Sequence, residues 1–188
     1  MLAVLCREGD KAPAEPGLAN IDWSRFIDPT PPEALLNPDP PEREFLARTT
    51  NFTEREARNK HLGTEGEKLI VQYEKHRLAA AGREDLAAEV EQVSETRGDG
   101  LGYDVRSFDP AYEKELFIEV KTTRSGKYQP FFITENERAF SEEYQNQYGL
   151  YRVYEFESAP RVFVLPGFVE HHVGLLPENY RAVFAKPE

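Results

Sequence analysis

The sequence predicts an α/β fold in which helices flank a mixed central sheet. Apolar residues recur at three- and four-residue spacing from Asn59 to Ala81, as on one face of a helix. Several apolar stretches of strand length follow, and one further helical stretch interrupts them. The expected order is therefore helix, three strands, helix, two strands, and 188 residues suffice for one such domain.

The first helix is expected from Asn59 to Ala81 and ends where Gly82 interrupts the pattern. Gly66 lies in the middle of its apolar face, where the missing side chain allows another backbone to approach closely. The face consists of Leu62, Gly66, Leu69, Ile70, Tyr73 and Arg77.

Three strands are expected next, over residues 90–95, 103–108 and 116–122. A glycine-rich loop, residues 98–102, joins the first two, and a turn at Asp109 and Pro110 joins the second to the third. Because the glycine loop connects two strands and does not open a helix, it fits a phosphate-cradling nucleotide site poorly.

The second half of the chain contains a helix start signal. A short strand over residues 131–133 precedes a capping box, with Thr134 at the N-cap and Glu137 three residues later. We expect a helix from there to Tyr148, followed by strands over residues 150–156 and 161–165.

The composition divides the chain into a proline-rich arm, residues 1–57, and a main domain, residues 58–188. Eight of the 14 prolines lie in the arm, so long regular elements are not expected there. The apolar residues Trp23, Phe26 and Ile27 predict that the arm docks on the main domain or on a partner. A poorly ordered lead-in is the alternative.

Charge and cysteine content narrow the class of protein. With 34 acidic and 23 basic residues the net charge is −11, which disfavours general coating of nucleic acid but is compatible with a carboxylate metal site. A single cysteine excludes an internal disulfide framework and a cysteine-rich zinc site. We find no apolar stretch typical of a membrane span or a secretory signal, so we expect a cytoplasmic protein without membrane partners.

The strand over residues 116–122 carries charges on an otherwise apolar element. Because side chains alternate along a strand, Glu119 and Lys121 share one face and Ile118 and Val120 share the other. A charged pair on a strand this apolar is costly unless it is paired or binds a ligand.

Asp104 begins the preceding strand, and the turn between the two strands would bring it beside Glu119. Two carboxylates on neighbouring strands suit a hard divalent cation such as Mg²⁺. Lys121 can then polarise an attacking water or hold a phosphate oxygen. Glu67 on the first helix can supply a third carboxylate, for a second metal or to orient Lys121.

Each of these signals also has an ordinary structural explanation. A Glu-x-Lys pair on a strand is often an exposed ion pair, and an aspartate after a glycine loop often caps a turn. Capping accounts for Asn136 and Glu137 without any catalytic role. The neighbouring residues His171 and His172 lack further ligands and do not indicate zinc.

Five motifs follow one another in the order of the predicted elements: LGTEGE (62–67), GDGLGYDV (98–105), FIEVKTT (117–123), FFITENE (131–137) and YRVY (151–154). The series resembles the PD-(D/E)XK nuclease superfamily and, over roughly residues 60–166, the NO VEIN C-terminal domain family, which is similar to Mrr-like restriction nucleases. The resemblance implies a restriction-endonuclease-like αβββαβ core with the acid pair on neighbouring strands. Gly-Tyr rather than proline precedes Asp104, which departs from the superfamily pattern.

Carried over by motif position, the resemblance implies a Mg²⁺-dependent endonuclease that hydrolyses DNA phosphodiester bonds, with Mn²⁺ able to substitute. Asp104, Glu119 and the Val120 carbonyl are the implied metal ligands, Lys121 is the catalytic lysine and Glu67 an accessory acid. The implied setting is restriction or anti-phage defence. The alternative is a catalytically silent nuclease-like module that binds nucleic acid or a partner protein in a defence complex, and a homodimer is a further expectation.

Three basic residues near the motifs are candidates for binding phosphates beside the scissile one. Arg106 follows Asp104 on the same strand, and Arg124 and Lys127 follow the Glu-x-Lys strand. Ordinary solvated surface charge is the alternative for each of them.

Overall fold

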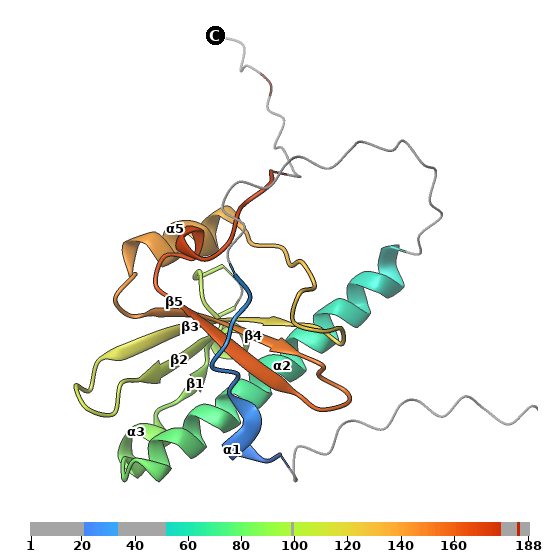
Figure 1. The fold of residues 1–188 in the computed structure, drawn as a ribbon. Coiled ribbons are helices and arrows are strands. Elements are labelled where there is room, and N and C mark those ends of the chain that lie inside the picture. Colours follow the sequence, from blue (N-terminus) through green and yellow to red (C-terminus); the bar gives the residue numbers. More distant parts are fainter. Residues whose placement is uncertain (1–20, 34–51, 99, 178–183, 185–188) are drawn as a thin grey trace, which may run out of the picture.

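The computed structural model of the chain describes residues 21–33, 52–98, 100–177 and 184. A long helix comes first in the main domain, a second helix interrupts the strands, and the last two strands follow it (Figure 1). The main elements are α2 (Phe52–Ala80), β1 (Glu91–Gln92), β2 (Val105–Phe108), β3 (Glu115–Thr122), α5 (Glu135–Glu143), β4 (Tyr148–Tyr154) and β5 (Arg161–Pro166). Shorter helices are α1 (Trp23–Phe26), α3 (Glu84–Ala88), α4 (Val93–Thr96) and the 3₁₀ turn η2 (Val169–His171).

The strands form a five-stranded sheet in the order β1-β2-β3-β4-β5. The pair β3 and β4 is parallel, and the other neighbouring pairs are antiparallel. The predicted α/β fold with a mixed sheet is therefore confirmed. The succession α2, β1, β2, β3, α5, β4 also follows the expected αβββαβ order, with α3 and α4 added on either side of β1.

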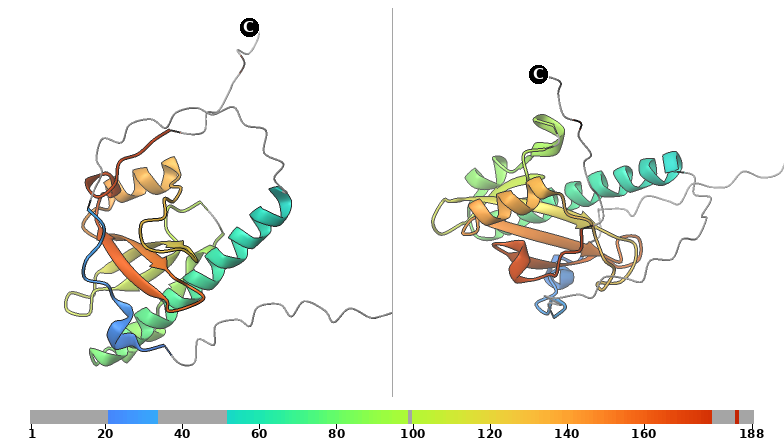
Figure 2. Two further views of the ribbon diagram at one scale, coloured as in Figure 1. Left: turned by 45° about the vertical axis from the view of Figure 1, so that its right-hand side comes forward. Right: turned by 90° about the horizontal axis from the view of Figure 1, so that it is seen from above.

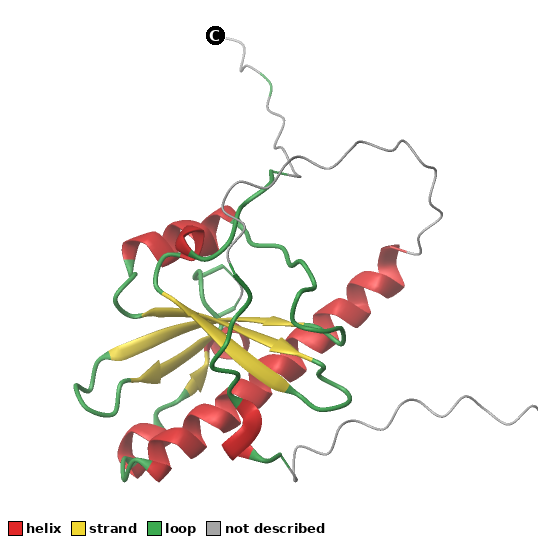
Figure 3. Ribbon diagram, viewed as in Figure 1, coloured by secondary structure: helices red, strands yellow, loops and turns green. Residues whose placement is uncertain are grey.

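The two faces of the sheet pack against different helices. Ile118 of β3 is buried in one core with Leu69 of α2, whereas Phe117 belongs to a second core against which Phe140 of α5 packs. The helices α2 and α5 thus lie on opposite sides of the sheet (Figure 3). Because side chains alternate along β3, Glu119 and Lys121 share the face of Phe117, as predicted, and this face is the one that α5 covers.

Helix α2 approaches β3 very closely at Gly66. A Cβ atom placed there would lie 1.8 Å from Oγ1 of Thr122, so a larger residue does not fit without movement. The predicted close approach at Gly66 is confirmed, and it places the next residue, Glu67, beside the end of β3.

The strand predicted over residues 90–95 is reduced to two residues. After β1 the chain turns into α4, where the backbone N–H groups of Val93 and Ser94 donate to the carbonyl of Asp104, at 2.7 and 3.3 Å. These hydrogen bonds replace a longer strand pairing. The prediction was wrong here because a short apolar stretch does not distinguish a strand from a single helical turn.

The other differences lie around α5. Residues 131–133 do not form a strand, because Phe131 and Ile133 pack against the second core without pairing. The capping box at Thr134 and Glu137 is confirmed, but α5 ends at Glu143 rather than Tyr148, which already belongs to β4.

The described part of the proline-rich arm packs on the main domain. Phe26 of α1 is only 1% exposed within the first core, and the Trp23 ring lies 5.9 Å from the ring of Tyr73. Ile27 forms a parallel bridge with Val162, which places the arm beside β5 (Figure 2). Docking on the main domain is thus confirmed for residues 21–33, and the predictions for residues 1–20 and 34–51 lie outside the described residues.

Within the part of the chain that the structure describes, no helix combines the length and the apolar character that a membrane crossing requires.

Candidate active site

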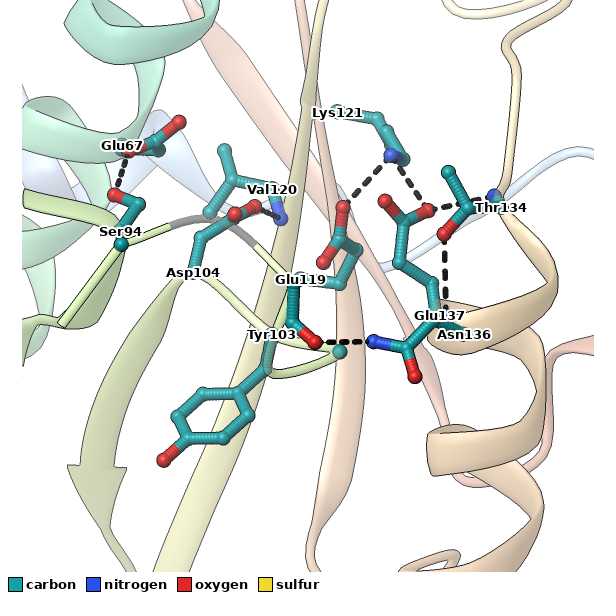
Figure 4. A pocket seen from close by; sticks show the side chains of 13 residues that line it. Glu67, Ser94, Tyr103, Asp104, Glu119, Val120, Lys121, Thr134, Asn136 and Glu137 are labelled. Atoms are coloured by element: carbon teal, nitrogen blue, oxygen red, sulfur yellow. Dashed lines mark hydrogen bonds and ion pairs between the residues drawn. The ribbon is translucent and has the colours of Figure 1, made fainter.

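A cavity of about 470 Å³ brings the predicted site residues together at one end of β2 and β3 (Figure 4). Glu67, Asp104, Glu119 and Lys121 all line it, as does Val120. These residues come from α2, the glycine loop and β3, and residues at the start of α5 complete the wall. The remaining lining residues are Ser94, Gly98, Gly100, Gly102, Tyr103, Thr134, Asn136 and Glu137.

Asp104 immediately precedes β2 and lies close to Glu119 of β3. Val105 pairs with Ile118 in the antiparallel ladder, and the backbone N–H of Asp104 donates to the Ile118 carbonyl at 2.9 Å. Asp104, immediately before β2, therefore lies against β3 close to Glu119, and both side chains line the cavity. Oδ2 of Asp104 accepts a hydrogen bond of 2.8 Å from the backbone N–H of Val120.

The glycine loop fixes the position of Asp104. Gly102 adopts a φ of +91°, a conformation that side-chain-bearing residues rarely adopt. A Cβ atom at Gly102 would also lie 2.6 Å from Cβ of Phe140, so the loop packs directly on α5. Gly102 therefore allows the glycine loop to pack closely against α5.

Lys121 is held between two carboxylates. Its ammonium lies 2.7 Å from Oε1 of Glu119 and 2.8 Å from Oε2 of Glu137 (Figure 4). Burial disfavours the charged amine, but Glu119 and then Glu137 outweigh burial and raise the pKa of Lys121 above its ordinary value. Lys121 is therefore a fixed positive charge in the cavity wall.

Glu67 is held by neutral donors on the opposite side of the cavity. Its Oε2 accepts hydrogen bonds from Ser94 Oγ at 2.5 Å and from Gln92 Nε2 at 3.0 Å. Glu67 does not contact Lys121, so the structure does not give it the predicted orienting role. The residue that orients Lys121 is Glu137.

Burial raises the pKa values of the Asp104 and Glu119 carboxyls. Burial, followed by the charge of Glu67, raises the pKa of Asp104 to about 7 against the opposing Val120 hydrogen bond. Burial also raises the pKa of Glu119 well above its ordinary value, although Lys121 opposes the shift. Two carboxyls that resist ionisation side by side are typical of functional sites, where a cation can compensate their charge.

The donor set is compatible with a hard cation. Among the described residues, Oδ1 of Asp104 and Oε2 of Glu119 accept no hydrogen bond, so each carboxylate keeps one oxygen for a ligand. Mg²⁺ takes oxygen ligands, usually one or two carboxylates together with water and substrate phosphate. Among the described residues, no three His, Cys, Asp or Glu side chains are grouped so that they could hold one metal ion. Substrate and water would have to supply the remaining ligands.

The three predicted phosphate-binding residues do not line the cavity. Arg106 pairs with Glu91 and Glu115. Arg124 pairs with Glu157 on the protein surface.

Lys127 is likewise engaged elsewhere, because its ammonium donates to Oδ2 of Asp28 at 3.2 Å and to the carbonyl of Thr30 at 2.9 Å. These two partners of Lys127 lie 99 and 97 residues away along the sequence. The basic residues near the motifs are therefore largely occupied by contacts that the sequence does not reveal.

Sequence reasoning missed three contributors to the site. Glu137 satisfies the capping box and also binds Lys121, whereas Ser94 holds Glu67. Asn136 donates to the Gly100 carbonyl at 2.6 Å and ties α5 to the glycine loop. The spacing of the TENE motif shows only its capping role, so nothing in the sequence revealed the second one.

The comparison with protein families agrees with the motif series. A family model described as "Protein NO VEIN, C-terminal" matches residues 66–165, a segment that contains every residue of the cavity wall. No curated protein and no solved structure matches the chain. Because the family model covers just over half of the sequence, the chain belongs to the NO VEIN C-terminal family.

Proposed function

We propose that the chain is a metal-dependent nuclease that hydrolyses DNA phosphodiester bonds, within the PD-(D/E)XK superfamily that the motifs resemble. The observation that carries the proposal is the placement of three residues in one cavity wall: Asp104, which immediately precedes β2, and Glu119 and Lys121 on the adjacent strand β3. Restriction or anti-phage defence is the setting that the family resemblance implies.

The proposal assigns Mg²⁺, or Mn²⁺ in its place, to Asp104 and Glu119, with the Val120 carbonyl as a third donor. Each carboxylate has one oxygen that accepts no hydrogen bond from the described residues. When bound, the metal supplies an activated water and stabilises charge on the phosphoryl oxygens. The cavity of about 470 Å³ offers room for a phosphodiester group beside these oxygens.

Lys121 contributes a permanent positive charge beside Glu119. Its ammonium has three N–H donors, of which two are directed to Glu119 and Glu137. The third is available for a phosphate oxygen or for the attacking water, and it acts where negative charge develops. Glu137 keeps the ammonium charged and positioned.

A catalytically silent module is the second candidate. It is favoured by the absence, within the described residues, of three or more potential ligands grouped around one point. The net charge of −11 also weakens general affinity for nucleic acid. Such a module would bind nucleic acid or a partner protein without turnover.

The deciding experiment is incubation of the full chain with plasmid DNA and single-stranded DNA, in Mg²⁺, in Mn²⁺ and in chelator. We expect cleavage that requires the metal. Asp104→Ala, Glu119→Ala and Lys121→Ala should each reduce it by about a thousandfold or more, as expected when a group that stabilises the transition state is lost.

The matched control is Glu115→Ala, which removes an exposed carboxylate from the other end of β3 and should leave cleavage unchanged. Circular dichroism of all variants should remain that of the wild type. If the three site variants cut as well as wild type, the site is misassigned. If the wild type binds DNA without cutting it under any metal, the silent module is the correct function.

A further inference from the structure

Arg152 is a buried cation next to the proposed site. It lies on β4 as the register partner of Lys121 on β3, and its side chain shares the α5 face of the sheet. Only 2% of its surface is exposed. Arginine is rarely buried to this extent unless a negative charge accompanies it.

No carboxylate of the described residues forms an ion pair with Arg152. Its one hydrogen bond within these residues runs from Nη2 to the Gln129 carbonyl at 2.9 Å, and its Nε has no partner. Arg77 shows the contrast, because Glu74 neutralises its guanidinium at 2.6 Å. Burial alone lowers the pKa of Arg152 to about 10, with no opposing contribution from an acid.

A buried guanidinium without an anion is strongly unfavourable, because nothing replaces its lost hydration. The chain has 34 acidic residues, yet none of the described ones is placed against this group. Among the described residues, Arg152 is therefore a buried cation without a neutralising partner. A planar guanidinium presents a fork of N–H donors that matches a phosphate group.

The cover over Arg152 is a loop and not the core of the sheet. The loop between β3 and α5 supplies the Gln129 carbonyl and the ring of Phe131, whose centroid lies 5.2 Å from the guanidinium carbon. Within residues 126–133 the backbone hydrogen bond recorded is that from Gln129 N–H to the Gly126 carbonyl. Moving the loop therefore breaks no strand pairing, and the side-chain contacts that anchor it include those of Lys127 with Asp28 and Thr30.

We propose that Arg152 binds a phosphate of the nucleic-acid strand beside the scissile one, after Gln129 and Phe131 have moved aside. The proposal rests on the proposed function, since Lys121 on the adjacent strand marks the reacting phosphate. In the free protein the Gln129 carbonyl and the Phe131 ring stand in for the anion. This assigns the phosphate contact to Arg152 rather than to Arg124, which Glu157 already occupies.

The test combines a protein variant with a modified substrate. Binding of a short oligonucleotide is measured in chelator for wild type and Arg152→Gln, with each phosphate replaced in turn by an uncharged methylphosphonate. Loss of one charge-assisted phosphate contact should weaken wild-type binding about tenfold at one position. In Arg152→Gln the same replacement should have no effect, and the salt slope should fall by about 1.

Two further variants control the comparison. Arg83→Gln removes a guanidinium that Asp85 and Glu113 already neutralise, and it should keep the full methylphosphonate effect. Arg152→Lys keeps the charge and should recover part of the affinity. If Arg152→Gln weakens binding yet every phosphate position responds as in wild type, Arg152 only packs the loop and the proposal is overturned.

A second measurement separates this proposal from the nuclease assignment. The side-chain Nε–H signal of Arg152 is followed by NMR while inorganic phosphate is added to the full chain. A saturable shift of this signal, without a matching shift of the Nε–H signal of Arg83, which Asp85 and Glu113 already neutralise, supports the anion site even if no nucleic acid binds and the proposed function fails. If the signal does not shift, and no methylphosphonate replacement changes the affinity of the wild-type protein for the oligonucleotide, Arg152 is not an anion-binding residue.

Discussion

Lys121 on β3 and Glu137 on α5 are joined by an ion pair of 2.8 Å through the same oxygen, Oε2, that accepts the backbone N–H of Thr134 at 3.0 Å. One carboxylate oxygen thus closes the capping box of α5 and binds the lysine of the proposed site. A movement of the first turn of α5 would therefore also displace the ammonium of Lys121.

Glu137→Gln should separate these two roles. A glutamine retains the capping-box hydrogen bond but loses the charge, so the free energy of unfolding should change little. If the proposed function holds, cleavage should fall tenfold to about a hundredfold, because the ion pair that positions Lys121 has been weakened. Denaturant unfolding and plasmid cleavage provide the two measurements.

Glu135→Gln is the matched control, since this exposed residue heads the same helix and pairs with Arg138. It should leave cleavage unchanged. An equal loss of cleavage in both variants would contradict a specific role for Glu137.

Gly66→Ala should destabilise the protein although alanine is the better helix former. The added methyl group would lie 1.8 Å from Oγ1 of Thr122, so α2 and β3 must separate. Overpacking of this kind costs about 1–3 kcal/mol. Urea unfolding measures the change.

Gly63→Ala lies one turn earlier on the same helix and has only Glu67 Oε1 near the new methyl group, at 4.0 Å. It should stabilise the protein by up to about 1 kcal/mol. Stabilisation by both substitutions would show that the close contact at Gly66 does not exist in solution.

Tyr148→Phe should leave the stability unchanged or raise it by up to about 1 kcal/mol, since removing an unpaired buried polar group relieves its desolvation cost. The hydroxyl of Tyr148 is buried and has no hydrogen-bond partner among the described residues. Burial, then Glu119, raises its pKa above the ordinary value. Thermal unfolding of the variant is the measurement.

Tyr151→Phe offers the comparison, because the hydroxyl of Tyr151 donates to Glu74 at 3.3 Å. This variant should lose about 1 kcal/mol. If Tyr148→Phe loses as much, its hydroxyl has a partner in solution.

Asp28→Asn should destabilise the protein at neutral pH and much less in acid. Burial opposes ionisation of Asp28, but hydrogen bonds from Thr30, Tyr154 and Lys127 outweigh it and lower the pKa below its ordinary value of 3.8. A lowered folded-state pKa adds stability that is present above the unfolded pKa and is lost as the pH falls through the folded one. Removing this hydrogen-bonded charge should cost about 1–3 kcal/mol at pH 7.

Urea unfolding at about pH 7 and pH 3 should therefore show a difference between Asp28→Asn and wild type that shrinks at the lower pH. Asp22→Asn is the control in the same arm, because asparagine caps α1 as well as aspartate does. A difference that does not depend on pH would argue against an ionised Asp28 in the folded protein.

The sequence predicted the sheet well wherever apolar alternation was long. β3 and β5 begin and end within one residue of their predicted limits, because each stretch has few alternatives to strand structure. The strand predicted over residues 90–95 was wrong because hydrogen bonds from α4 to the Asp104 carbonyl determine the conformation of this segment. Such non-local hydrogen bonds leave no local sequence pattern.

The sequence was sufficient to predict that Asp104, Glu119 and Lys121 belong to the candidate site, but not which residues hold them in place. Alternation placed Glu119 and Lys121 on one face, and the antiparallel pairing of β2 with β3 brings Asp104, just before β2, close to Glu119. The pairing of Lys121 with Glu137 depends on how α5 packs across the sheet. The absence of a described acid near Arg152 becomes visible only when the surroundings of its side chain are known.

The bridge between Ile27 and Val162 has a practical consequence for how this protein is handled. β5 is the last strand of the sheet, and the backbone N–H of Asp28 donates to the Val162 carbonyl at 2.7 Å. A chain shortened to begin at Phe52, the first residue of α2, would leave that carbonyl and its neighbours free to pair with another molecule. Such a fragment should self-associate during purification, so binding and cleavage assays need the intact N-terminal arm.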